Sequence, residues 1–222
     1  MQEALEALRD EIEAACAGTG RSREEVTLIA VSKTFPAAAI REAHELGLRD
    51  FGENRVQELT AKAEDLRDLE FRWHLIGPLQ TNKVRAILPH LGLLHSLDRI
   101  DLAREISRRA VRPIEALIQV NTTAEKSKSG VEPEGLAALL DALEGIPSLT
   151  VRGLMTIGPL GGDERSVRTA FATLRSLRER EQARRPELDL AALSMGMSGD
   201  FAWAIAEGAT HLRIGSRIFG RR

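Results

Sequence analysis

The chain has 222 residues, of which 43% are apolar, and a formal net charge of −2 at neutral pH. The length predicts one or two domains, and single α/β barrels reach this size. The near-balance of charge excludes a strong electrostatic attraction to nucleic acid or to an anionic membrane. Cys16 is the only cysteine, so we expect neither an internal disulfide nor a thiolate metal site within one chain. This cysteine usage suits a reducing compartment, and we expect a cytoplasmic protein.

Residues 1–18 predict an amphipathic helix. Leu5, Leu8, Ile12 and Ala15 fall on one face, and glycines follow the last turn. The segment is charged throughout and lacks the apolar core of a signal peptide, and no apolar run in the chain approaches membrane-spanning length. We therefore expect no membrane association, and a helix that packs on the main domain.

A run of apolar and β-branched residues at 26–31 predicts a fully buried strand. Pro36 disfavours helix in the residue before it, so the strand is expected to end ahead of it. Lys33 then lies at the carboxyl end of a buried strand. Burial against an apolar wall shifts a lysine toward its neutral form, and a neutral amine can form a Schiff base with a carbonyl. The alternative interpretation is a strand-end lysine that points into water.

The rest of the chain repeats one unit, a short apolar strand followed by a loop and a helical pattern. Strands are predicted to begin near Val26, Asp50, Arg72, Leu93, Ile114, Leu149, Asp189 and His211. The spacing suits parallel strands joined by helical crossovers, and apolar stripes at helical period occupy residues 37–47, 135–145 and 166–180. The pattern predicts a single (β/α)8 barrel domain over residues 1–222. A doubly wound open sheet is the main alternative, but the chain lacks a G-x-G-x-x-G turn.

Functional residues of such a barrel lie on the loops that follow the strands. Two of these loops carry glycine and serine, residues 194–198 after the seventh strand and 213–216 after the eighth. Phosphate binds at this place in many barrels, because glycine lets the backbone approach an anion and serine adds a hydroxyl donor. A helix expected to begin at Phe201 would point its N–H groups to the same place. The alternative interpretation is that Gly196 and Gly215 only make tight turns.

The histidines and the remaining sequence motifs do not indicate a metal site or a further catalytic site. His74 follows Trp73 in an apolar strand and is interpreted as a core histidine, and His211, at the start of a strand, is expected to be structural. The chain has no H-E-x-x-H motif, no paired cysteines and no cluster of histidine with carboxylates, so we expect no metal. It also has neither a G-x-S-x-G elbow nor a Walker A motif.

Six ordered motifs closely resemble the pyridoxal 5′-phosphate homeostasis protein family, over roughly residues 20–222. They are AVSKT at 30–34, FGENRVQE at 51–58, WHLIGPLQTNK at 73–83, SKSG at 127–130, SMGMS at 194–198 and RIGSRIFG at 213–220. The resemblance implies a single barrel like that of alanine racemase and related fold-type III enzymes. It also implies a protein that carries or buffers pyridoxal 5′-phosphate (PLP), affecting vitamin B6 and amino-acid balance, without established catalysis.

The same resemblance implies how the cofactor is held. Lys33 would form a covalent aldimine with PLP, and Arg213 would face the pyridine nitrogen. The other cofactor-binding residues lie at strand ends: Asn54 and His74 along the ring, Ser194, Ser198, Gly215 and Ser216 at the phosphate, and Met197 in the same loop.

Two absences argue against an ordinary racemase. The alanine racemase route needs a tyrosine as second base, and this chain has no tyrosine. Because the predicted barrel takes up the chain, we also expect no β-rich second domain of the kind that completes that site. A PLP-dependent racemase or lyase of low activity and a cofactor-free Schiff-base aldolase remain as alternatives. We expect a monomer whose partners are PLP and, where the cofactor is passed on, PLP-dependent apoenzymes.

The chain departs from the family pattern at two positions. Many members have a second lysine where this chain has Phe35, and an acidic residue where it has Gly199. A transfer role for that lysine has no counterpart here, although Lys128 of the SKSG loop is retained.

Overall fold

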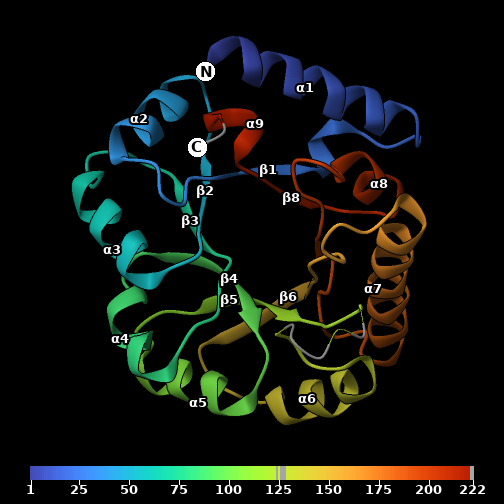
Figure 1. The fold of residues 1–222 in the computed structure, drawn as a ribbon. Helices are drawn as coiled ribbons and strands as arrows, with labels where there is room; N and C mark the ends of the chain where they lie inside the picture. The colour runs from blue at the N-terminus through green and yellow to red at the C-terminus, as the bar shows by residue number, and fades with distance from the viewer. Residues whose placement is uncertain (124, 126–128, 221–222) are drawn as a thin grey trace.

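The computed structural model describes residues 1–123, 125 and 129–220, and its strands β1–β8 close into a parallel barrel (Figure 1). The strands follow one another round the barrel in chain order: β1 Thr27–Val31, β2 Asp50–Glu53, β3 Arg72–Leu75, β4 Leu91–Leu97, β5 Ile114–Gln119, β6 Leu149–Met155, β7 Ala192–Ser194 and β8 His211–Ile214. The first and last strands pair, with Thr27 opposite His211. The barrel prediction is confirmed, and the open doubly wound sheet is excluded.

Helices surround the barrel (Figure 1). Their bounds are α1 Gln2–Ala17, α2 Ala37–Glu45, α3 Val56–Asp65, α4 Val84–Ile87, α5 Ile100–Arg109, α6 Leu136–Leu143, α7 Glu164–Arg184, α8 Phe201–Ala206 and α9 Ser216–Phe219. The longer ones bury an apolar stripe, which in α5 is Leu102, Ala103 and Ile106. The three predicted stripes lie in α2, α6 and α7, and α7 extends beyond its predicted range at both ends. None of the described helices is long and apolar enough to cross a membrane.

The predicted strand starts differ most from the structure at β7. This strand was expected to begin near Asp189 and begins at Ala192. Asp189 is exposed and lies 3.3 Å from Arg152 in an ion pair. The N–H of Leu190 donates to the side chain of Gln182 on α7 at 2.9 Å. Because this N–H donates to a helix side chain and not to a neighbouring strand, β7 begins later than the apolar pattern indicates.

Helix α1 packs on the outside of the barrel beside α8 and α9 (Figure 1). Glu11 of α1 pairs with Arg217 of α9, whose Nη1 lies 2.8 Å from Oε2 of the glutamate. The predicted apolar face is confirmed, with Cys16 rather than Ala15 as its last fully buried member: Leu5, Leu8, Ile12 and Cys16.

The barrel interior combines two small apolar clusters with a set of polar side chains. One cluster is Ile29, Val31 and Ile76, and the other is Leu93, Leu117, Met155 and Ala192. Branched apolar residues dominate most barrel interiors, and burying a polar group costs free energy unless it finds a hydrogen-bond partner. The buried polar residues of the inner strand faces therefore need an explanation: His74, His95, Ser194 and Arg213.

Candidate functional site

Lys33 lies in the turn that follows β1, on the side of the barrel where the strands end. The last residue of β1, Val31, has Gly52 of β2 as its register partner. Lys33 and Asn54 thus follow the ends of two neighbouring strands. The side chain of Lys33 is exposed. Of the two interpretations, the exposed side chain agrees with a strand-end lysine that points into water, and Lys33 follows the end of β1 as predicted.

A buried charge cluster holds the turn after β1. Lys62 Nζ donates to Ser32 O at 2.8 Å, to Glu53 Oε1 at 2.6 Å and to Glu58 Oε1 at 2.8 Å. Ser32 Oγ donates to the same Glu53 oxygen at 2.7 Å, and the Thr34 N–H donates to Glu58. Thr34 has a φ of 68°, a left-handed conformation that costs a non-glycine residue about 1–2 kcal/mol. The cluster therefore fixes a strained turn.

The loops after β7 and β8 meet beside this turn. Ser216 Oγ donates to Ser198 Oγ at 3.0 Å. A Cβ atom on Gly215 would lie 2.8 Å from the carbonyl oxygen of Val31, so only glycine allows the two backbones to lie this close. Hydroxyl groups and the N–H groups at a helix start both donate to anions, and α9 begins at Ser216. The loop pair therefore fits a phosphate group next to the end of β1.

The two departures from the family pattern lie in the turn after β1 and in the loop after β7. Phe35 stacks on Phe219 of α9 with ring centroids 5.1 Å apart, so it packs the turn after β1 against α9. Gly199 is exposed, and no atom lies within 4 Å of where its Cβ would be. Nothing in the structure explains glycine there. Helix α8 begins as predicted, after Asp200, whose Oδ1 accepts the Met197 N–H.

Arg213 is buried inside the barrel, two residues before Gly215, and is 4% exposed. Its Nη1 donates to Ser194 Oγ at 2.6 Å, and its Nη2 donates to Thr156 O at 2.8 Å. Burial lowers the pKa of the guanidinium to about 10, and the charge of Asp200 opposes this shift. The group is therefore cationic at neutral pH, and two acceptors on the barrel wall set its orientation.

Ser194 and His74 lie inside the barrel, with their polar atoms bonded to other side chains. Ser194 Oγ is 2.9 Å from His95 Nδ1, and His95 Nε2 is 2.9 Å from His74 Nδ1. His74 Nε2 is 2.8 Å from Asp50 Oδ1. Ser194, His74 and His95 are all fully buried. This placement fits a core histidine at His74, and the hydrogen bonds of Ser194 and His74 run to other side chains of the barrel interior.

Acid is expected to destabilise the protein through its buried histidines. Burial lowers the pKa of His74, lowers that of His95 well below its usual value, and lowers that of His211 to about 4. Below about pH 6.5 the histidines of the unfolded chain therefore bind protons that the folded chain excludes. As the pH falls, the free energy of unfolding decreases by up to about 1.4 kcal/mol per histidine and pH unit. Burial raises the pKa of Glu53 and Asp200, which offsets part of this loss. Urea unfolding at about pH 7 and about pH 5 measures the net effect. The His95→Gln variant should show a smaller difference, and a parent protein equally stable at both values would contradict the expectation.

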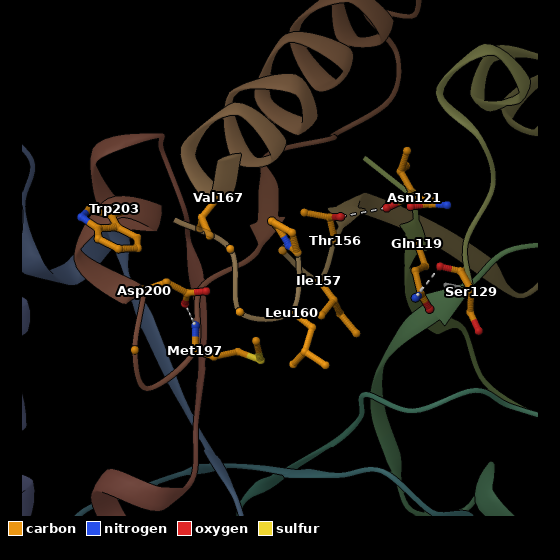
Figure 2. Close-up of a pocket in the computed structure, with 16 residues that line it drawn as sticks. Gln119, Asn121, Ser129, Thr156, Ile157, Leu160, Val167, Met197, Asp200 and Trp203 are labelled. Atoms are coloured by element: carbon orange, nitrogen blue, oxygen red, sulfur yellow. Dashed lines mark hydrogen bonds between the residues drawn. The ribbon is translucent and has the colours of Figure 1, made fainter. Parts of the chain in front are cut away.

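A cavity of about 520 Å³ opens beside the loop after β7 (Figure 2). Its walls come from the ends of β5 and β6, from residues 157–162, and from Met197, Gly199 and Asp200 of the loop after β7. Three exposed apolar side chains line it: Ile157, Leu160 and Met197. Gln119 and Asn121 add amide groups. An apolar lining with a few fixed polar groups is typical of a site for a small organic molecule.

The structure brings most of the predicted site residues together at the carboxyl end of the barrel: Lys33, Asn54, Ser198, Gly215 and Ser216, with Met197 at the cavity and Arg213 just inside. The charge cluster was missed, although Glu58 and Lys62, which lie on α3, stand four residues apart, a spacing that favours an ion pair on a helix. Lys128 lies outside the described residues. Among the described residues, no group of three or more His, Cys, Asp or Glu is placed to hold a metal ion.

The barrel and its strand-end residues define a known class of protein. A family model described as alanine racemase, N-terminal domain, matches residues 4–222. The chain is 46% identical to a pyridoxal phosphate homeostasis protein of Pseudomonas aeruginosa, over 95% of this chain and 91% of the relative. It is also 46% identical to one of Aquifex aeolicus, over 99% and 97%. Within the alanine racemase N-terminal class, the chain therefore belongs to the pyridoxal phosphate homeostasis protein family.

Solved structures agree with this family. PipY from Synechococcus elongatus, determined without PLP, superposes with a TM-score of 0.90 at 42% identity and covers 99% of this chain and all of its own. A second PipY structure, with PLP bound, has a TM-score of 0.85 and covers 94% of this chain. Alanine racemase from Corynebacterium glutamicum shares the fold, with a TM-score of 0.71 at 18% identity, over 62% of that chain.

Proposed function

We propose that this protein binds PLP at the carboxyl end of the barrel, with Lys33 as the point of covalent attachment, and serves intracellular vitamin B6 balance. The observation that carries the proposal is the meeting of the β1 turn with the loops after β7 and β8, where Ser198 and Ser216 lie 3.0 Å apart. The homeostasis relatives and the PLP-bound PipY structure support it. Lys33 and the proposed phosphate-binding residues Gly215 and Ser216 follow neighbouring strands, since β1 pairs with β8.

Each residue group supplies one part of the binding. The Lys33 amine condenses with the cofactor aldehyde to a Schiff base and releases water. Ser198, Ser216 and the Gly215 backbone hold the phosphate, and Asn54 lies along the ring. Bound PLP supplies an electron sink to an attached amine. Arg213 disfavours protonation of the ring nitrogen because like charges repel, and this weakens the sink.

The role we propose is that of a carrier, not of an enzyme. The chain has no tyrosine to act as a second base. A carrier of this kind would act as a cytoplasmic monomer and pass PLP to apoenzymes. The cavity beside Met197 has room for an amine and favours a second candidate, a racemase or lyase of low activity. Exchange of an amino acid's α-hydrogen in D₂O above the rate with free PLP would establish that candidate.

The visible absorption of the purified protein tests the proposal. We expect a yellow band, present on purification or after addition of PLP, which borohydride removes. Peptide mass mapping should then place a pyridoxyl adduct on Lys33. If no band forms with added PLP, or if the adduct lies elsewhere, the proposed site is wrong.

A further inference from the structure

A continuous chain of side-chain hydrogen bonds crosses the interior of the barrel drawn in Figure 1. It runs from Asp50, the first residue of β2, through His74 of β3 and His95 of β4 to Ser194 of β7. It ends at Arg213 of β8, and its four links measure 2.8, 2.9, 2.9 and 2.6 Å. Strands far apart in the sequence are thus joined through the barrel centre, where apolar side chains would normally pack.

The two ends of this chain lie at different depths. His74, His95 and Ser194 are fully buried, and Arg213 is nearly so. The side chain of Asp50 is 25% exposed, and this residue begins its strand. The chain therefore connects the amino end of the barrel, where Asp50 meets water, with the guanidinium just inside the carboxyl end.

The chemistry of the two ends fixes the direction of every link. An ionised aspartate only accepts hydrogen bonds, and an arginine only donates. His74 must then donate from Nε2 to Asp50 and accept at Nδ1. His95 must donate from Nε2 and accept at Nδ1, and Ser194 must donate to His95 and accept from Arg213. Each neutral histidine has one donor and one acceptor nitrogen, so this single arrangement satisfies all five groups.

Both histidines are suited to the neutral state that this arrangement needs. Burial is the main cause that lowers the pKa of His74 and of His95, and the carboxylate of Asp50 only partly opposes it at His74. The positive charges of Arg213 and Arg72 act in the same direction on His95.

We propose that Asp50, His74, His95 and Ser194 form a relay of positioning residues that aims Arg213 at the bound cofactor. The relay presents a lone pair of Ser194 to Nη1, while Thr156 O holds Nη2. The guanidinium keeps further N–H donors, whose direction is then fixed for a ring nitrogen. This inference rests on the proposed PLP function and adds to it the residues that orient the arginine.

The tautomers of the two histidines test the relay without any cofactor. In ¹⁵N-detected NMR of the apo protein at neutral pH, His74 and His95 should both be Nε2–H tautomers, with unprotonated Nδ1. An Nδ1–H tautomer or a doubly protonated ring at either residue would overturn the relay. The assignments follow from the His74→Gln and His95→Gln variants, each of which removes one set of signals.

Binding of PLP tests what the relay does. Ser194→Ala removes the acceptor for Arg213, and we expect PLP to bind about tenfold more weakly, the value of one net hydrogen bond. With ¹⁵N-labelled cofactor, the pyridine nitrogen signal should move from its position in the parent protein. His95→Phe should have the same two effects. Ser194→Thr keeps the hydroxyl and should therefore bind PLP with the affinity and the ring-nitrogen signal of the parent protein.

His211→Phe is the matched control. Its ring lies 6.2 Å from that of His95, but its Nδ1 bonds to Thr210 and not to the relay. This variant should bind PLP as the parent does. Parent-like affinity and ring-nitrogen signal in Ser194→Ala would overturn the proposal. If the parent itself binds no PLP at Lys33, the proposed function fails, and the tautomer experiment still decides whether the relay exists.

Discussion

Replacing Lys33 by alanine should abolish covalent PLP binding while leaving the fold intact. The amine is the only group of the turn that can form a Schiff base with an aldehyde. The side chain is exposed in a turn after the end of β1, and surface substitutions usually change stability by less than about 0.5 kcal/mol. We therefore expect loss of the yellow band and of the borohydride adduct. Urea unfolding of the apo variant should give the same midpoint as that of the apo parent.

Lys83→Ala is the control for this experiment. Lys83 is half-buried in the short helical turn after β3 and has no role in the proposed site. The Lys83→Ala variant should keep both the yellow band and the borohydride adduct. A band of parent intensity in Lys33→Ala would mean that another lysine carries the cofactor. A large loss of apo stability would mean that Lys33 supports the fold.

Much of the fold follows from local pattern, because strands of this barrel pair in chain order. Each strand needs only its own apolar run and a helical crossover of sufficient length to be placed. The errors occur where a side chain replaces a ladder bond, as with Gln182 and the N–H of Leu190 before β7. The predicted site at strand ends follows from the same logic, since loops after parallel strands meet on one face.

The interior contacts could not be predicted in this way. His95 and Ser194 are 99 residues apart in sequence, and only closure of the barrel and the stagger of its strands bring them together. The motif resemblance assigned Ser194 and His74 to the cofactor, whereas the structure shows their polar atoms turned to Arg213, His95 and Asp50. Motif resemblance by itself does not separate residues that would contact a ligand from residues that contact only other side chains.

Replacing Lys62 by methionine should destabilise the protein more than any surface change. Lys62 is nearly buried and bonds to Glu53, Glu58 and Ser32 O. Removing one partner of a buried ion pair costs about 3–5 kcal/mol, because the other charge is left without compensation. Burial already raises the pKa of Glu53, and among the described residues its Oε2 has no hydrogen-bond partner. Urea unfolding at neutral pH measures the loss.

A double-mutant cycle separates charge from packing at this cluster. Glu53→Gln removes the buried charge and keeps an oxygen to accept the hydrogen bond of Ser32 Oγ. Lys62→Met combined with Glu53→Gln should therefore be more stable than Lys62→Met alone, with a coupling energy of about 1–3 kcal/mol. Strictly additive effects would show that Lys62 acts through its aliphatic chain. Because the cluster also holds Ser32 and Thr34, Lys62→Met should weaken PLP binding, and the double variant should not fully restore it, since neither neutral side chain replaces the ammonium bond to Ser32 O.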